Sequence, residues 1–399
     1  MTPTIGCHSH CICIACHAKH KSCKNGWLRV HSSRRAADMA SMAALPPLAP
    51  IDHGSGFERH ILVTGGAGFI ASHVVILLCK KYPKYKILNF DRVDYCSCLE
   101  NLEEVANLPN YKFVKGDICS ADLVNYVLET EKIDTIMHFA AQTHVDNSFG
   151  NSFQFTRNNI LGTHVLLEAA KVHDVVRFVH VSTDEVYGEG ENMESAPMIE
   201  DHVLEPTNPY AATKAAAEFL VKSYHRSFGL PVIITRGNNV YGPHQFPEKM
   251  IPKFINQLAR GRCVTLHGTG ENTRNFLFVE DVARAFDCIL HKAEIGKVYN
   301  IGGSNEQSNV EVAKQLIGIM GLKEQEASLI SFVPDRAFND LRYTIDNSAL
   351  EALGWVELMP WEEGLKRTVE WYRKYSVRYP NIEQALVAHP RIESAVSAI

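Results

Sequence analysis

The chain has 399 residues, a formal net charge of -5, and a composition of 46% hydrophobic and 21% charged residues. These values are ordinary for a soluble globular protein, and the weak negative charge gives no reason to expect a nucleic-acid partner. No apolar run approaches the roughly 20 residues that a membrane-spanning helix needs, and the first residues lack the apolar stretch of a secretory signal. We therefore expect a cytoplasmic protein that binds neither membranes nor nucleic acids.

Cysteine and histidine are concentrated near the N-terminus. The cysteines of this segment are Cys7, Cys11, Cys13, Cys16 and Cys23. The Cys13-x-x-Cys16 spacing suits a pair of zinc ligands, but no second pair completes a known zinc signature. Residues 1–58 show no helical or strand periodicity, and residues 44–56 (ALPPLAPIDHGSG) are typical of a linker. We interpret residues 1–58 as a disordered extension, with a zinc site as the alternative.

From Arg59 onward, short apolar runs alternate with amphipathic stretches. Residues 60–66 predict a buried strand, 69–81 a helix and 85–91 a second strand, which together make one βαβ unit. The rhythm continues at 111–118, 121–132, 133–141, 158–173, 175–183, 209–229 and 231–243. Such alternation predicts an α/β fold with a doubly wound parallel sheet of the Rossmann type.

Beyond residue 242 the alternation gives way to mixed helix and loop, ending in an amphipathic helix at 361–375. We expect this part to form a smaller mixed α/β lobe that binds the substrate across the strand ends. The predicted organisation is an extension at 1–58, a dinucleotide-binding domain with the catalytic residues at 59–242, a substrate-binding lobe at 243–375 and a C-terminal tail at 376–399.

A glycine-rich turn marks the predicted cofactor site. Gly66-x-Gly68-x-x-Ala71 follows a predicted strand and opens a predicted helix, which is the setting of the dinucleotide fingerprint. Small residues there let the backbone approach a pyrophosphate at the helix N-terminus. Asp91 ends the second strand, where a carboxylate binds a ribose hydroxyl and repels the extra phosphate of NADP. Arg92 is a counter-signal, because a basic neighbour accommodates that phosphate. NAD is the predicted cofactor.

A tyrosine and a lysine lie four residues apart on one predicted helix. The Tyr210-x-x-x-Lys214 spacing puts both side chains on one face, where the ammonium can lower the phenol pKa and make it a base. Thr183 ends a predicted strand, at the sheet edge where ligands bind. Asp184 and Glu185 follow, and two carboxyls beside a hydride-transfer site can serve as the acid and the base of an elimination.

Six segments carry a family resemblance. They are VTGGAGFIASH at 63–73, HFAAQTHVDNS at 138–148, STDEVYG at 182–188, NPYAATKAAAE at 208–218, NNVYGPHQFPEK at 238–249 and YNIGG at 299–303. From about Arg59 to Tyr375 the chain resembles the nucleotide-sugar 4,6-dehydratases of the extended short-chain dehydrogenase/reductase family. The Asp184–Glu185 pair is the most specific feature, since related epimerases carry small residues there and UDP-glucuronate decarboxylases usually keep only the glutamate.

The resemblance implies a role for each catalytic candidate. Tyr210 would deprotonate the sugar 4-hydroxyl while hydride passes from C4 to NAD, with Lys214 and Thr183 assisting. The new ketone acidifies the C5 hydrogen, which Glu185 would remove, and Asp184 would protonate the departing 6-hydroxyl. Hydride then returns to C6, so NAD is regenerated within each turnover.

The resemblance also implies binding residues and an assembly. For the NAD site it implies Gly65, Gly66, Gly68, Phe69, Ile70, Asp91, Asp117, Ile118, Ala140, Ala141, His144, Asn158, Tyr210 and Lys214. For the nucleotide-sugar substrate it implies Thr183, Asn239, Lys249, Arg274, Asn309 and Arg336. Arg274 and Arg336 are suited to forked recognition of phosphate oxygens. No catalytic metal is expected, and the family's long helices pack across a two-fold axis in a homodimer.

Three alternative functions use the same fold. A 4-epimerase or UDP-glucuronate decarboxylase of this family would need no acid at position 184, so Asp184 argues against both. A non-catalytic NAD-sensing protein would not need the whole catalytic set, although fold alone does not determine function.

The nucleotide depends on segments such as residues 335–340. DRAFND stands there in place of the DRPGHD common in bacterial dTDP-glucose enzymes, and it is more similar to the dehydratase part of plant rhamnose synthases. We therefore expect UDP-glucose as the substrate, with dTDP-glucose as the alternative. The expected product is a 4-keto-6-deoxy sugar for deoxysugar or rhamnose biosynthesis, which a separate enzyme would complete.

Overall fold

The computed structural model describes residues 48–188, 196–334 and 344–386. The cysteine- and histidine-rich segment, Arg336 with most of its neighbours, and the last residues of the predicted tail lie outside these ranges. Among the described residues, no helix is both long and apolar enough to cross a membrane.

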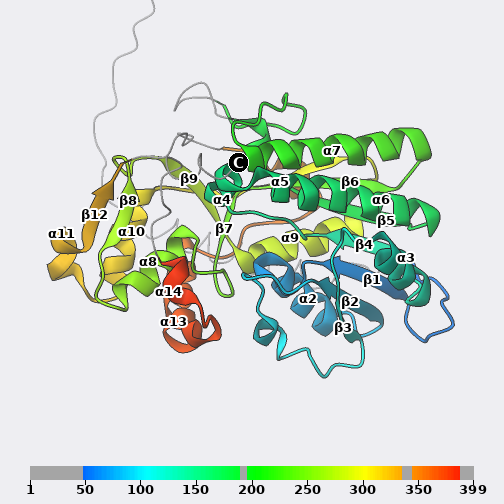
Figure 1. Cartoon of the computed structure of the whole chain (residues 1–399), viewed down its shortest axis with the longest axis horizontal. Coiled ribbons are helices and arrows are strands. Elements are labelled where there is room, and N and C mark those ends of the chain that lie inside the picture. The colour runs from blue at the N-terminus through cyan, green and yellow to red at the C-terminus, as the bar shows by residue number, and fades with distance from the viewer. Residues whose placement is uncertain (1–47, 189–195, 335–343, 387–399) are drawn as a thin grey trace, which may run out of the picture. The chain divides into compact units, whose positions relative to one another are not determined.

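A seven-stranded sheet with the order β10-β6-β5-β4-β1-β2-β3 forms the centre of the larger lobe (Figure 1). Every pairing within it is parallel. Its strands are β1 (Arg59–Thr64), β2 (Tyr85–Asp91), β3 (Tyr111–Lys115), β4 (Thr135–His138), β5 (Arg177–Thr183), β6 (Val232–Gly237) and β10 (Val298–Ile301). Strand order reverses beside β1, and this switch point is where ligands bind in open α/β sheets. The predicted Rossmann-type fold is confirmed.

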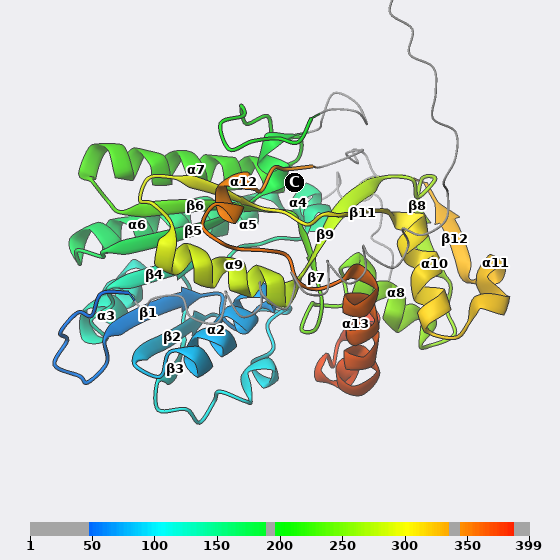
Figure 2. The same ribbon diagram turned by 180° about the vertical axis from the view of Figure 1, so that it is seen from behind.

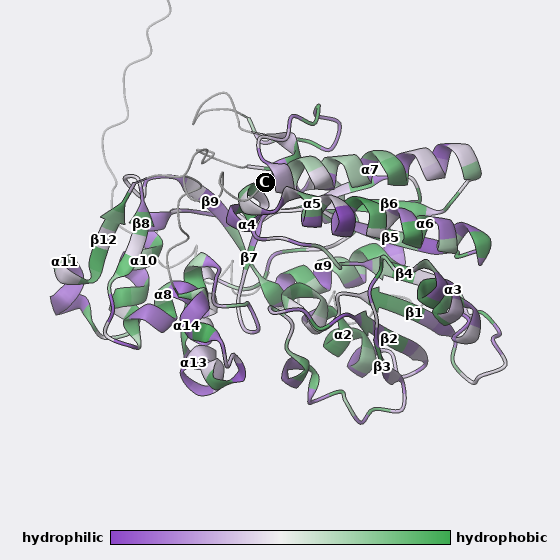
Figure 3. Ribbon diagram, in the orientation of Figure 1, coloured by the Kyte–Doolittle hydropathy of each residue, from purple (hydrophilic) through white to green (hydrophobic). Residues whose placement is uncertain are grey.

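Helices cover both faces of this sheet. On one face lie α3 (Ala121–Thr130), α6 (Gly162–Val172) and α7 (Pro209–Phe228), and on the other α2 (Phe69–Lys81) packs against α9 (Val279–Lys292), as Figure 2 shows from behind. Buried apolar side chains of the strands, such as Leu62 and Ile136, pack with Leu166 and Val221 of the helices. All six residues of β1 are buried, and Figure 3 colours this strand as mostly hydrophobic. Burial on both faces explains why the strands read as continuous apolar runs.

The smaller lobe combines two short sheets with helices. The sheets contain β7 (Asn239–Tyr241), β9 (Thr273–Phe278) and β11 (Asn305–Ser308), and β8 (Val264–His267) with β12 (Ile330–Val333). The helices are α8 (Met250–Leu258), α10 (Asn309–Ile319), α11 (Glu326–Leu329) and α13 (Trp361–Tyr375). Its core contains Tyr241, Phe276, Phe278 and Trp361, whose rings meet edge to face or tilted. These aromatic side chains hold α13 against β7 and β9.

The remaining short helices join these elements. They are α4 (Val145–Gly150), α5 (Ser152–Phe155), the π-helical turn Thr156–Leu161 that leads into α6, α12 (Ser348–Glu351) and α14 (Ile382–Ala385). Three short 3-10 segments, Leu99–Leu102, Lys323–Gln325 and Ser376–Arg378, complete the connections together with Asp184–Tyr187.

The structure differs from the sequence interpretation in four places. The strand predicted at 231–243 divides into β6 and β7, which belong to different sheets. Although residues 279–301 fall in the range predicted for the smaller lobe, α9 and β10 lie with the large sheet. Residues 48–58 belong to the predicted extension, yet they dock on the sheet. The predicted tail also begins in a packed form, since Tyr379, Ile382 and Leu386 are buried.

The docking of residues 48–58 has identifiable contacts. The Leu48 N–H donates to the Tyr85 hydroxyl at 2.6 Å, and the His53 ring lies 2.9 Å from the Asp134 carboxylate. Composition resembling a linker could not reveal these contacts, because both partners come from elsewhere in the chain.

Candidate active site

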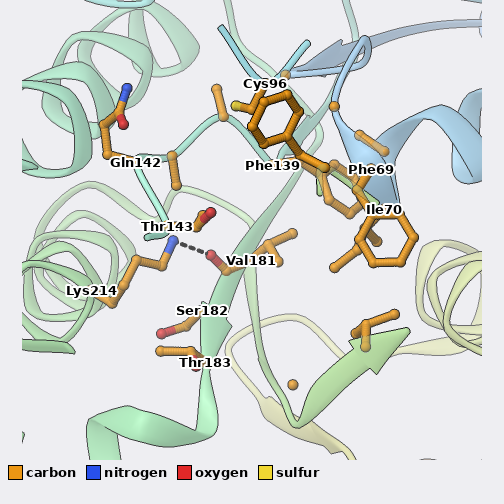
Figure 4. Close-up of a pocket in the computed structure, with 18 of the residues that line it drawn as sticks. Phe69, Ile70, Cys96, Phe139, Gln142, Thr143, Val181, Ser182, Thr183 and Lys214 are labelled. Atoms are coloured by element: carbon orange, nitrogen blue, oxygen red, sulfur yellow. Dashed lines mark hydrogen bonds between the residues drawn. The ribbon is translucent and has the colours of Figure 1, made fainter. Parts of the chain in front are cut away.

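A cavity of about 320 Å³ opens at the carboxyl ends of β1, β4 and β5. This volume falls within the usual range for small-molecule sites. Phe69 and Ile70 of α2 line one side, and Thr183 and Lys214 line the opposite side (Figure 4). The larger lobe supplies most of the lining, and Asn239 and Lys249 belong to the part that begins the smaller lobe.

The glycine-rich turn packs closely against the residues after β4 and leads into α2. Gly65 has a φ of +70°, and a Cβ there would lie 2.8 Å from the Cα of Ala140. Gly68 precedes α2 without a side-chain cap, so the first N–H groups of the helix have no side-chain acceptor at this position. This arrangement suits a pyrophosphate. Gly66 does not line the cavity. A Cβ at this position would collide with Asn89, so the glycine serves close packing.

Asp91 ends β2 and organises the adjoining loop. Its carboxylate accepts hydrogen bonds from Ala67 N–H at 3.0 Å, Val93 N–H at 2.7 Å and the Ser97 hydroxyl at 3.1 Å. Asp91 also lines the cavity, so its carboxylate is available to a ribose hydroxyl as the sequence predicts. Together with the glycine turn, it gives the cavity the polar groups that a dinucleotide needs.

Helix α7 is held firmly where it carries Tyr210 and Lys214. Asn208 caps the helix by accepting from Ala211 N–H at 2.9 Å, and Pro209 occupies the first turn. Farther along, the buried Glu218 accepts from Arg236 of β6 at 3.0 and 2.7 Å. This forked ion pair ties the helix to the sheet and sets the direction in which Tyr210 faces.

The two carboxyls after β5 have different partners. Asp184 is buried and accepts from Asn238 Nδ2 at 2.5 Å and from the Thr183 hydroxyl at 3.1 Å. Glu185 is half-buried and accepts from Asn208 Nδ2 at 3.0 Å. Asn208 therefore both caps α7 and fixes one carboxyl, which places that carboxyl beside the tyrosine-bearing helix.

Burial gives Asp184 the properties of an acid. Burial, followed by the neighbouring charge of Glu185, raises the pKa of Asp184 to about 7, against the opposing hydrogen bonds from Asn238 and Thr183. An aspartate with this pKa still carries a proton in much of the population near neutral pH. It can therefore donate a proton to a leaving group.

The pKa of Tyr210 moves in the opposite direction from the sequence prediction. Burial and the nearby charge of Glu185 raise it, whereas we expected Lys214 to lower it. The Lys214 ammonium donates to the Val181 carbonyl at 2.5 Å, as the dashed line in Figure 4 shows. Burial lowers the pKa of Lys214 to about 8, although the charge of Glu218 opposes this shift. The expectation that Lys214 lowers the pKa of Tyr210 is therefore wrong.

A family model described as GDP-mannose 4,6 dehydratase matches residues 62–368. The chain belongs to this family. The match covers both lobes and confirms the resemblance to nucleotide-sugar 4,6-dehydratases seen in the sequence.

Individual relatives of this family are also similar over most of the chain. An Arabidopsis thaliana protein named as a trifunctional UDP-glucose 4,6-dehydratase/UDP-4-keto-6-deoxy-D-glucose 3,5-epimerase/UDP-4-keto-L-rhamnose-reductase is 58% identical over 335 residues, which are 84% of this chain and 50% of that protein. This chain thus spans about half the length of that relative. The human dTDP-D-glucose 4,6-dehydratase is 49% identical over 341 residues, covering 84% of this chain and 96% of the human protein.

A solved structure agrees with these relatives. The crystal structure of DesIV, a dTDP-glucose 4,6-dehydratase from Streptomyces venezuelae with NAD bound, has a TM-score of 0.77 and 40% identity. The similarity covers 81% of this chain and 100% of that one.

Most of the residues that the family resemblance implied line the cavity. They are Gly65, Gly68, Phe69, Ile70, Asp91, Asp117, Ile118, Ala140, Ala141, Asn158, Thr183, Asp184, Glu185, Tyr210, Lys214, Asn239 and Lys249. Among the other predicted residues, His144 caps α4, and its ring lies 3.9 Å from the Glu248 carboxylate. Arg274 donates to the Thr273 carbonyl at 2.7 Å, and Asn309 begins α10. These three and Gly66 do not line the cavity, and Arg336 lies outside the described residues.

The sequence interpretation missed several polar residues that hold the site together. Asn208 and Asn238 each donate to one carboxyl of the acid pair. Asn159 donates to the Gln142 carbonyl and to the Thr213 hydroxyl, both at 3.0 Å, which connects the end of β4 to α7. Asn208 and Asn238 lie within family segments that the sequence analysis quoted and Asn159 does not, but spacing alone reveals the partner of none of them.

Proposed function

We propose that the chain is an NAD-dependent 4,6-dehydratase that converts a nucleoside-diphosphate glucose into its 4-keto-6-deoxy sugar. The observation that carries this proposal is the acid pair Asp184 and Glu185 beside Thr183, Tyr210 and Lys214 around one cavity. The redox residues alone would suit any oxidation of an alcohol. The additional acid and base suit the removal of water.

The cofactor proposed for this reaction is NAD. Its support is that Gly65 and Gly68 line the cavity, that the N-terminus of α2 has no side-chain cap, and that the carboxylate of Asp91 lies at the same cavity. Bound NAD would supply the hydride acceptor for sugar C4 and the hydride source for C6. Phe69 and Ile70 would cover the dinucleotide from the side opposite Lys214.

The oxidation step needs a base for the sugar 4-hydroxyl. We assign this role to Tyr210, which lines the cavity together with Thr183 and Lys214. Because burial raises the pKa of the phenol, the step needs its phenolate form, which the positively charged nicotinamide of bound NAD would favour. The Thr183 hydroxyl, at the end of β5, would hydrogen bond to the reacting oxygen. Lys214 places a positive charge at the same wall of the cavity.

The elimination step uses the two carboxyls in opposite roles. Once C4 is a ketone, the C5 hydrogen is acidic, and Glu185 takes it as a proton. The electron pair left at C5 forms the double bond to C6 and expels the 6-hydroxyl, which Asp184 protonates so that it leaves as water. The raised pKa of Asp184, about 7, supports its role as the acid. Glu185 returns its proton to C5 when hydride reaches C6.

We infer that the preferred nucleotide is uridine diphosphate, with dTDP-glucose as the alternative substrate. The support is the 58% identity to the Arabidopsis relative named for UDP-glucose, against 49% to the human relative named for dTDP-glucose. Equal concentrations of the two sugars should yield mostly the UDP product, read by product mass. A mostly dTDP product would reverse the assignment, and no product from either sugar would overturn the dehydratase proposal.

Glu185→Gln tests the division of roles. This variant should still transfer hydride from the sugar to bound NAD, seen as NADH absorbance, but should release product at least about 100-fold more slowly, since it lacks the base. Normal loss of water by this variant would remove Glu185 from the mechanism.

We further propose that the protein forms a homodimer through α6 and α7. These neighbouring helices and the turn before α6 leave several large apolar side chains exposed, namely Leu161, Val172, Phe219 and Phe228. Light scattering should give a dimer mass, and Phe219→Glu should shift it towards the monomer. A monomeric parent protein would contradict the proposal.

The proposed location is the cytoplasm. Its support is chemical: the six cysteines of the described residues are all free thiols, as is usual in a reducing compartment. Fractionation of cells that produce the full chain would test it, and recovery with organelles would contradict it.

A further inference from the structure

The turn after β2 surrounds a basic side chain with carboxylates. Arg92 donates to the Asp94 carboxylate, and its other terminal nitrogen lies 3.7 Å from the Asp117 carboxylate. Asp91, Arg92, Asp94 and Asp117 all line the main cavity. Arg92 is the residue that, by sequence alone, would favour the phosphate of NADP. Its ion pairs decide whether it can do so.

Asp94 is itself held in place from a second direction. Its carboxylate accepts from Gln142 Nε2 at 2.9 Å and from Tyr95 N–H at 2.8 Å. Burial works to raise the pKa of Asp94, but the hydrogen bonds and the charge of Arg92 hold it below its usual value. The carboxylate therefore stays charged at neutral pH. Gln142 comes from the loop after β4, so the orientation of Asp94 does not depend on its own turn alone.

The backbone of this turn has a strained conformation at Val93, which its surroundings hold in place. Val93, between Arg92 and Asp94, has a φ of +60°. A β-branched residue rarely adopts this conformation, and such strain persists only where the surroundings enforce it. The Val93 N–H donates to the Asp91 carboxylate at 2.7 Å, which locks the turn. The turn thus directs Arg92 and Asp94 towards each other at a cost in backbone energy.

The summed charge around this turn opposes the binding of the additional phosphate of NADP. The three carboxylates Asp91, Asp94 and Asp117 carry -3 and Arg92 carries +1, so the sum is -2 around the place where a ribose would bind. Arg157 lines a neighbouring hollow with Arg92 and Asp117, but its side chain is exposed and screened by water. An incoming dianionic phosphate would meet net repulsion, because the nearby guanidinium is already paired.

We propose that Asp94 is a specificity-determining residue that makes the site select NAD over NADP by keeping Arg92 in an ion pair. This inference rests on the proposed dinucleotide cofactor. Asp91 alone would provide repulsion that a free neighbouring arginine could offset. With Arg92 held by Asp94, that compensation is removed.

Asp94→Asn tests the inference through binding rather than turnover. Full-length protein freed of cofactor would be titrated with NADH and with NADPH, and binding would be followed by nicotinamide fluorescence. The variant should bind NADPH about tenfold more tightly than the parent, the gain expected from one charge-assisted hydrogen bond to phosphate. Its affinity for NADH should change less than threefold. An unchanged affinity for NADPH would overturn the inference.

Two further variants separate the ion pair from simple charge. The double variant Asp94→Asn with Arg92→Ala has the same local sum of -2 as the parent but lacks the guanidinium, so the gain in NADPH affinity should disappear. If the gain persists, Asp94 acts by its own repulsion and the inference is wrong. Asp122→Asn is the matched control, because it removes one exposed carboxylate from the start of α3 and should leave both affinities unchanged.

The outcomes also separate this inference from the proposed function. Tight NADH binding by the parent, with no effect of Asp94→Asn on NADPH, would overturn only the role of Asp94. A parent protein that binds neither dinucleotide would overturn both. If the asparagine variant does not fold, Asp94→Ser provides the same release of Arg92, and its expected gain for NADPH is the same.

Discussion

Charged side chains at the two ends of the cavity have different surroundings. At the end of β2, Arg92 is balanced by carboxylates, and the loop hydrogen bonds leave its turn rigid. Near the end of β5, Asp184 and Lys214 are buried, and burial shifts their pKa values to about 7 and about 8. Paired charges hold a ligand in place, whereas buried charges that titrate near neutral pH can move protons.

This contrast separates binding from chemistry within one pocket. Changes at the end of β5 should reduce the rate of the reaction and leave dinucleotide affinity nearly unchanged. Changes at the end of β2 should alter cofactor choice or stability and leave the rate at saturating cofactor nearly unchanged. A loss of dinucleotide affinity from changes at the end of β5, or a loss of rate at saturating cofactor from changes at the end of β2, would contradict this separation.

The largest effect is expected for Tyr210→Phe. Without the phenol oxygen no group takes the proton of the 4-hydroxyl, so kcat should fall about 1000-fold, and NADH should not accumulate on the protein. Product formation and NADH absorbance measure both steps. Tyr224→Phe removes a hydroxyl from the same helix far from the cavity, where it bonds to Glu168, and should keep its activity. Equal losses in the two variants would indicate a general effect on α7.

A smaller loss is expected for Asp184→Asn, together with a changed pH profile. Because the pKa of Asp184 is raised to about 7, its acid form dominates below this pH and is lost above it. The parent kcat/KM should therefore fall as pH rises through about 7. The variant should be about 100-fold slower and should lack this fall. If the alkaline fall persists in the variant, another group is the acid.

The smallest effect is expected for Val93→Gly, at the other end of the cavity. Relief of the left-handed strain at φ +60° offsets the entropy that glycine loses on folding. The free energy of unfolding should stay the same or rise by about 0.5 kcal/mol. Val176→Gly, at a position without positive φ, should instead lose about 1 kcal/mol. Denaturant titration of both variants measures the difference, and equal losses would show that Val93 is not strained.

Much of this protein could be predicted from local patterns in its sequence. Apolar periodicity located the strands and helices of the large sheet, and the helix predicted at 361–375 matches α13 at both ends. The glycine turn, Asp91, and the cluster from Thr183 to Lys214 were also visible, because each depends on neighbouring residues or on one turn of a helix. The resulting Rossmann-type fold and family are confirmed.

Only the tertiary structure decided the partners and the pKa values. The partners Asn238 and Asn208 of the acid pair, and the pairing of Arg92 with Asp94, connect groups whose spacing shows no pattern. The tertiary structure also took β10 into the large sheet and kept Arg274 out of the cavity lining. Backbone periodicity depends on adjacent residues, whereas burial and charge depend on every segment that packs nearby. The direction of the Tyr210 pKa shift was therefore mispredicted, because the burial that dominates it exists only in the folded chain.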